Sequence, residues 1–238
     1  MIVAAVVAAA SLLVLAAQAQ IPADPVAAAE FLVHYSGQGH CEEPEILAWS
    51  CNQPQCQNTM GTFSTTFYTT VKTGGHAYSA VNERQEAIFF VVRGTDNPRN
   101  TLQDARFLFV RYLLQSPPMT LTRVIQTQLA GAPEGVEVHK GFYASWLDFE
   151  PQVIPQLELL RQAHPTFKIY TTGHSLGGAV AVMAAAHMHL LGWNVTSYSY
   201  GQPRVGNPAF AQWFQSVEPD AVRITAVINE NIKAIINS

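Results

Sequence analysis

Charged side chains are scarce in this chain. Lys, Arg, Asp and Glu together make up 13% of the 238 residues, and the formal net charge is -4. Nucleic-acid binding requires a basic surface that neutralises phosphates, so we expect no nucleic-acid partner. Because 48% of the residues are hydrophobic, the chain can bury one large core, and we expect a single domain.

Cysteine is equally rare. The three cysteines, Cys41, Cys51 and Cys56, lie close together near the N-terminus. Cys51 and Cys56 have no second ligand pair nearby, which argues against a structural zinc site, and no motif for another metal or a cofactor is present. In an exported protein two of the three thiols can form a disulfide, and the sequence leaves the pairing open.

One long apolar run stands at the N-terminus. It covers residues 2–17, has no Lys or Arg before it, and is followed by Ala17-Gln18-Ala19, a small-x-small cleavage pattern. The run is shorter than the roughly 20 residues of a membrane span and has no stop-transfer charges behind it. We therefore interpret residues 1–19 as a secretory signal peptide and residues 20–238 as one extracellular domain.

Strand-like and helix-like segments alternate along the rest of the chain. Runs rich in β-branched and aromatic residues predict strands over residues 63–70, 76–81, 86–92, 107–114, 167–172, 194–200 and 221–228. Apolar spacing and small residues predict helices over residues 26–35, 143–164, 179–186 and 208–216, and residues 41–60 are interpreted as a loop. This order predicts an α/β fold, with a mostly parallel central sheet covered by helices on both faces.

The most informative motif is Gly-His-Ser-Leu-Gly-Gly at residues 173–178, between a predicted strand and a predicted helix. A Gly-x-Ser-x-Gly sequence in this setting places its serine at a sharp turn above the sheet, so Ser175 is the candidate nucleophile. Acyl transfer also needs two donors for the oxyanion. The candidates are the backbone N–H of Leu176, at the helix N-terminus, and that of Thr95, just past the strand at residues 86–92.

Four ordered motifs carry a family resemblance. They are Val-Arg-Gly-Thr at residues 92–95, Val-His-Lys-Gly-Phe at 138–142, the serine motif at 172–179, and Tyr-Gly-Gln-Pro-Arg-Val-Gly-Asn-Pro at 200–208. Over about residues 68–225 the chain resembles the fungal-type class 3 lipase family of α/β-hydrolases, which includes triacylglycerol lipases and feruloyl esterases. The resemblance implies a secreted enzyme that cleaves carboxylic esters of lipids or related substrates through an acyl-serine, without a cofactor. Ser175 would be the nucleophile, with Thr95 and Leu176 as the oxyanion hole.

The resemblance also implies a lid. It would consist of Asp96, Asn97, Pro98, Arg99, Asn100, Thr101, Leu102, Gln103 and Asp104. Leu102 is its one large apolar residue, so opening this segment would expose little apolar surface, and we expect only weak contact with a lipid interface. The next apolar run, residues 107–110, either lines an acyl-binding cleft or is a core strand.

The acid and base of a catalytic triad are not identified. The family's acid would follow residues 223–225, but residues 226–236 contain no aspartate, and no histidine follows His189. We interpret Glu230 as a solvated residue, because there is no histidine for it to orient. His187 and His189 fall on the predicted helix several turns beyond Ser175 and are poor bases. His139 and His174 are interpreted as structural. Three hypotheses remain: an enzyme represented by a C-terminally truncated chain, an inactive lipase-like binding protein, or a fragment that does not fold.

Asn194-Val195-Thr196 matches the acceptor sequence for N-linked glycosylation. We place it at the start of a buried strand and leave its occupancy open.

Overall fold

A computed structural model describes residues 20–50, 59–94 and 126–225. In chain order its elements are α2 (Pro25–Gln38), α3 (Glu43–Ala48), β1 (Thr62–Thr69), β2 (His76–Asn82), the 3-10 helix η1 (Glu83–Gln85), β3 (Ala87–Val92), β4 (Gln126–Gln128), β5 (Glu137–His139), α6 (Lys140–Ala163), β6 (Lys168–His174), α7 (Leu176–Leu190), β7 (Val195–Tyr200), α8 (Pro208–Val217) and β8 (Val222–Ile224). No helix in these ranges has the length and apolar character needed to cross a bilayer.

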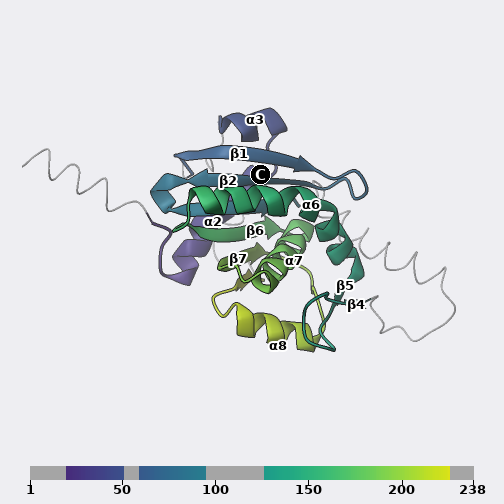
Figure 1. The fold of residues 1–238 in the computed structure, drawn as a ribbon. Coiled ribbons are helices and arrows are strands. Elements are labelled where there is room, and N and C mark those ends of the chain that lie inside the picture. Colours follow the sequence, from purple (N-terminus) through teal and green to yellow (C-terminus); the bar gives the residue numbers. More distant parts are fainter. Residues whose placement is uncertain (1–19, 51–58, 95–125, 226–238) are drawn as a thin grey trace, which may run out of the picture.

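A six-stranded sheet with the order β1-β2-β3-β6-β7-β8 forms the centre of the fold (Figure 1). The first three strands run antiparallel, while β3, β6, β7 and β8 run parallel. Helices α6 and α7 lie on one face and α2 on the other. This arrangement confirms the predicted α/β architecture. Parallel pairing also brings the carboxyl ends of β3, β6 and β7 to one edge of the sheet.

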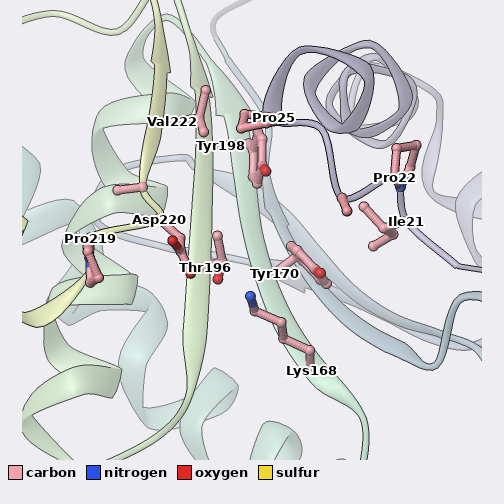
Figure 2. Close-up of a pocket in the computed structure, with 12 residues that line it drawn as sticks. Ile21, Pro22, Pro25, Lys168, Tyr170, Thr196, Tyr198, Pro219, Asp220 and Val222 are labelled. Carbon is pink, nitrogen blue, oxygen red and sulfur yellow. The ribbon is translucent and has the colours of Figure 1, made fainter.

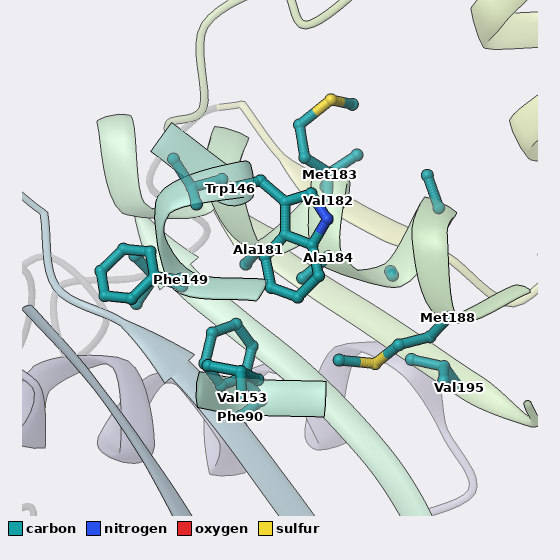
Figure 3. Packing of buried hydrophobic residues seen from close by; sticks show 14 of the residues in the cluster. Phe90, Trp146, Phe149, Val153, Ala181, Val182, Met183, Ala184, Met188 and Val195 are labelled. Atoms are coloured by element: carbon teal, nitrogen blue, oxygen red, sulfur yellow. The ribbon is translucent and has the colours of Figure 1, made fainter. Parts of the chain in front are cut away.

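Alternate residues of β3 enter two different cores. Ile88, Phe90 and Val92 face the layer of α6 and α7, where Phe90 meets the fully buried Trp146 edge-on at 6.0 Å between ring centroids (Figure 3). Phe89 faces α2 and stacks on Tyr35 at 3.8 Å. Both faces of β3 are buried, which explains why the strand is apolar at every position, as its sequence predicts.

Two sequence predictions need correction. Residues 41–60 are not all loop, because α3 forms within them. There Glu42 and Glu45 make a capping box, in which each side chain binds the other residue's backbone N–H. The helix predicted to start at Tyr143 starts at Lys140, because the His139 side chain caps it.

Several predicted features lie outside the described residues. They are the signal peptide at residues 1–19, Cys51 and Cys56, the oxyanion residue Thr95, the lid residues 96–104, the strand predicted at 107–114, and Glu230. Cys41 has no disulfide partner among the described residues, and the bridge stays a prediction.

Candidate active site

Ser175 occupies a sharp turn between β6 and α7. Its backbone angles are φ 52° and ψ -123°, and its N–H donates to the carbonyl of Tyr200 at 2.9 Å. A non-glycine residue with positive φ is strained by roughly 1–3 kcal/mol, and such strain persists where the surroundings enforce it. Here β6, α7 and the end of β7 enforce it. The half-buried serine side chain is thus held at the carboxyl edge of the sheet.

The glycines around Ser175 are required by close backbone contacts. A Cβ added to Gly173 would lie 2.6 Å from the carbonyl carbon of Gly177. One added to Gly177 would collide with the Val92 carbonyl oxygen and lie 2.7 Å from the carbonyl carbon of Arg93. These contacts are tighter than real Cβ atoms show, and their partners are backbone atoms. The turn therefore fits only because these side chains are absent.

The first turn of α7 presents unpaired donors. The first N–H groups of a helix have no acceptor within the helix, and no described side chain caps this one. Leu176 is its first residue, and the positive end of the helix dipole favours negative charge there. The end of β3 lies against this turn, since a Cβ on Gly94 would be 2.7 Å from the His174 carbonyl oxygen. Thr95 follows Gly94 in sequence.

The histidine–carboxylate pairs on α7 lie too far from Ser175 to act on it. His187 accepts the indole N–H of Trp146 at 3.0 Å through Nδ1, and its Nε2 lies 3.7 Å from Glu150. His189 Nε2 lies 3.2 Å from Glu218. These histidines stand twelve and fourteen residues after the serine, which is about 18 and 21 Å along the axis of α7.

The remaining histidines named from the sequence are His139 and His174. Nδ1 of His139 accepts the backbone N–H groups of Gly141 and Phe142 at 3.1 and 3.4 Å, and so caps α6. The ring of His174 points toward Gly201, where an added Cβ would lie 3.4 Å from His174 Nε2. No described group of three or more His, Cys, Asp or Glu side chains could hold a metal ion.

Two of the sequence motifs turn out to build one scaffold. Val138 of β5 forms a β-bridge with Gly206, and the His139 N–H donates to the Val205 carbonyl at 2.7 Å. Asn207 accepts the N–H groups of Glu137 and of Phe210, at 3.3 and 2.8 Å, and caps α8. The motifs at 138–142 and 200–208 therefore fix the loop that follows β7. This loop begins just after Tyr200, which anchors the serine.

A pH effect follows from His174. Burial, aided by the nearby His40, lowers the pKa of His174 from 6.5 to about 4. As the pH falls below 6.5, His174 becomes protonated in the unfolded chain, but in the folded chain it stays neutral until about pH 4. The free energy of unfolding therefore decreases as the pH falls from 6.5 to 4. A shift of one pKa unit corresponds to about 1.36 kcal/mol of stability. Because the ring is half-buried and partly screened by solvent, we expect a smaller loss than the whole shift would give, about 1–2 kcal/mol.

Urea unfolding at pH 7 and pH 4.5 measures this loss. His174→Gln should lose less stability between the two pH values than the unmodified chain, whereas His164→Gln serves as the control. Equal losses in all three proteins would contradict the assignment to His174.

A family model described as Lipase (class 3) matches residues 89–231. The chain belongs to the class 3 lipase family. A lipase of Rhizopus niveus is 32% identical over 173 residues, which is 71% of this chain and 39% of that protein. Secreted mono- and diacylglycerol lipase 1 of Fusarium solani is 33% identical over 154 residues, 65% of this chain and 41% of that protein.

Solved structures of the family support the fold. The native Rhizomucor miehei lipase in its propeptide complex superposes with a TM-score of 0.69 at 25% identity, covering 85% of this chain and 60% of that one. Together with the parallel strands and flanking helices, this confirms the α/β-hydrolase fold. The chain spans about two fifths of the length of the curated lipase-family relatives described above.

Proposed function

We propose that this chain carries the nucleophile of a secreted serine ester hydrolase. The observation that supports the proposal most is the backbone of Ser175, held at positive φ between a strand and a helix N-terminus. Glycines surround it where any side chain would collide. A serine with only a structural role does not require a strained backbone surrounded by glycines. A nucleophile does, because this turn exposes its hydroxyl to the substrate.

The reaction is acyl transfer from an ester to the serine and then to water. Ser175 Oγ attacks the ester carbonyl, and the negative charge that forms on the carbonyl oxygen is accepted by the N–H of Leu176 together with that of Thr95. The carbon–oxygen bond to the alcohol then breaks, and the alcohol leaves with a proton. Water hydrolyses the acyl-serine and returns the serine to its starting state.

The general base and its carboxylate come, in this proposal, from outside the described residues. His139 caps α6, and His187 and His189 pair with carboxylates at the far end of α7. His174 directly precedes the serine, and its ring faces Gly201. A serine without a base keeps only part of its activity, since an oxyanion hole alone leaves roughly a thousandfold acceleration over water. The lid at residues 96–104 is part of the same proposal.

Lipid esters are the proposed substrates. The Fusarium relative is named as a mono- and diacylglycerol lipase and as secreted, which supports both an ester-linked lipid substrate and an extracellular location. The polar lid sequence favours weak interfacial contact and esters that are soluble or short-chained.

A fluorophosphonate probe tests the nucleophile, because it phosphonylates an activated serine. We expect it to label Ser175 in the product of the whole gene and more slowly in the 238-residue chain. Ser175→Ala should abolish labelling, while Ser216→Ala, at an exposed serine on α8, should not change it. A folded whole-gene product that stays unlabelled would overturn the proposal in favour of a lipase-like binding protein.

A further inference from the structure

A cavity lies at the opposite end of the strands from Ser175. Its volume is about 460 Å³, and it opens between the segment that leads into α2 and the first residues of β6, β7 and β8 (Figure 2). Lys168, the first residue of β6, lies about 20 Å from the serine end of that strand, given the rise of an extended chain. The cavity is therefore separate from the candidate active site.

Its lining carries polar groups that have no hydrogen-bond partners among the described residues. They are the ammonium of Lys168, the hydroxyls of Thr196, Tyr170 and Tyr198, and the carboxylate of Asp220. Lys168 Nζ lies 5.4 Å from the centre of the Tyr170 ring, and the two tyrosine rings are 6.4 Å apart. Burial raises the pKa of Tyr170 to about 12, so its hydroxyl remains a hydrogen-bond donor even in alkaline solution.

This set of groups suits a sugar. A ring with several hydroxyls both donates and accepts hydrogen bonds, which matches an ammonium donor, a carboxylate acceptor and hydroxyls that do both. The C–H face of such a ring packs on aromatic side chains such as Tyr170 and Tyr198. An anion fits less well, because Asp220 would repel it.

The chain has an attachment point for a sugar at the rim. Asn194-Val195-Thr196 is its single Asn-x-Ser/Thr sequence. The Asn194 side chain is exposed and makes no hydrogen bond within the described residues, whereas Thr196, two residues later, lines the cavity. Trp193 and Val195, the residues on either side of Asn194, both pack in the core on the opposite face, so Asn194 lies on the cavity side. Extending the Ile169–Val195 register by one residue sets it beside Lys168.

We propose that Asn194 carries an N-linked glycan whose first sugar covers this cavity. The proposal rests on export of the chain, which is part of the proposed function. In the secretory pathway Nδ2 of Asn194 would form a bond to the anomeric carbon of a lipid-pyrophosphate-linked oligosaccharide. The bond from that carbon to the pyrophosphate breaks, and the amide loses one proton.

Occupancy is tested by producing the full chain in a eukaryotic secreting host, once as it stands and once behind a foreign secretion leader. We expect one endoglycosidase-sensitive mobility shift. Asn194→Gln and Thr196→Val should abolish the shift, and Thr196→Ser should keep it. A chain exported by the foreign leader without a shift overturns the glycan. A shift seen only with that leader supports the glycan and counts against native export.

Placement is tested with an amine-reactive reagent. The glycan should slow modification of Lys168 several-fold compared with Asn194→Gln, while the exposed Lys72 reacts equally in both proteins and serves as the internal control. Enzymatic removal of the glycan should restore the Lys168 rate. An occupied Asn194 with no protection of Lys168 would show that the sugar points away from the cavity and overturn that part of the proposal.

Discussion

Replacing Gly177 with alanine is expected to destabilise the folded chain by about 3 kcal/mol or more, the upper range for a group forced into a filled space. The new Cβ would collide with the carbonyl oxygen of Val92 and lie 2.7 Å from the carbonyl carbon of Arg93. Backbone atoms of a central strand cannot turn aside as a flexible side chain does. Relief requires α7 to move away from β3, which separates the helix from the sheet it covers.

Urea unfolding followed by circular dichroism measures this change, with Gly39→Ala as the matched control. Gly39 follows α2 at φ -59°, and its added Cβ would approach the Ser36 carbonyl oxygen only to 3.2 Å. We expect this control to cost about 1 kcal/mol, because the Ser36 carbonyl has to shift by only a few tenths of an ångström. If Gly177→Ala is as stable as the control, the contact between the turn and β3 is looser than described.

Gly177→Ala should also affect Ser175, the proposed nucleophile. A shift of α7 would release Ser175 from positive φ and move the Leu176 N–H away from its position beside the serine. In the whole-gene product, we therefore expect fluorophosphonate labelling to fall even at temperatures where most of the protein is folded. Unchanged labelling would mean that the turn keeps its geometry without the close contact.

The sequence predicts the centre of this fold well because the signals there are local. The apolar run of β3 reflects burial on both faces, and the glycines around Ser175 reflect contacts that tolerate no side chain. Helix starts were predicted less well. The helix α3 and the first turn of α6 begin at the N-cap residues Glu42 and His139, which are not among the residue types common at that position.

The site was predicted only in part, for a related physical reason. Ser175 and Leu176 are adjacent in sequence, so one motif specifies both. The tertiary fold brings a general base and its carboxylate close to a serine from distant parts of the chain, so no local sequence motif predicts them. Conversely, the sequence gives no sign that Glu218 is buried. Glu218 follows α8 in a polar segment typical of an exposed helix end, yet its side chain is buried against β7 and α7.

Glu218→Ala is expected to cost about 3–5 kcal/mol, the range for removing one partner of a buried pair. The carboxylate is 2% exposed, and its two oxygens serve different elements. Oε1 accepts the backbone N–H of Ser197 in β7, and Oε2 lies 3.2 Å from Nε2 of His189 at the end of α7. Alanine would leave the Ser197 N–H buried without an acceptor and remove the contact with His189, which weakens the link between β7, α7 and the end of α8.

Two comparisons separate these contributions. Glu218→Gln keeps an oxygen for Ser197 but loses the charge, so we expect a smaller cost of about 1–2 kcal/mol. Glu158→Ala removes an exposed carboxylate that pairs with Arg161 at 2.7 Å, and it should cost less than about 1 kcal/mol. Chemical denaturation of the three variants gives the ranking. If Glu218→Ala resembled Glu158→Ala, water would reach the carboxylate and its link between β7, α7 and α8 would not hold the fold together.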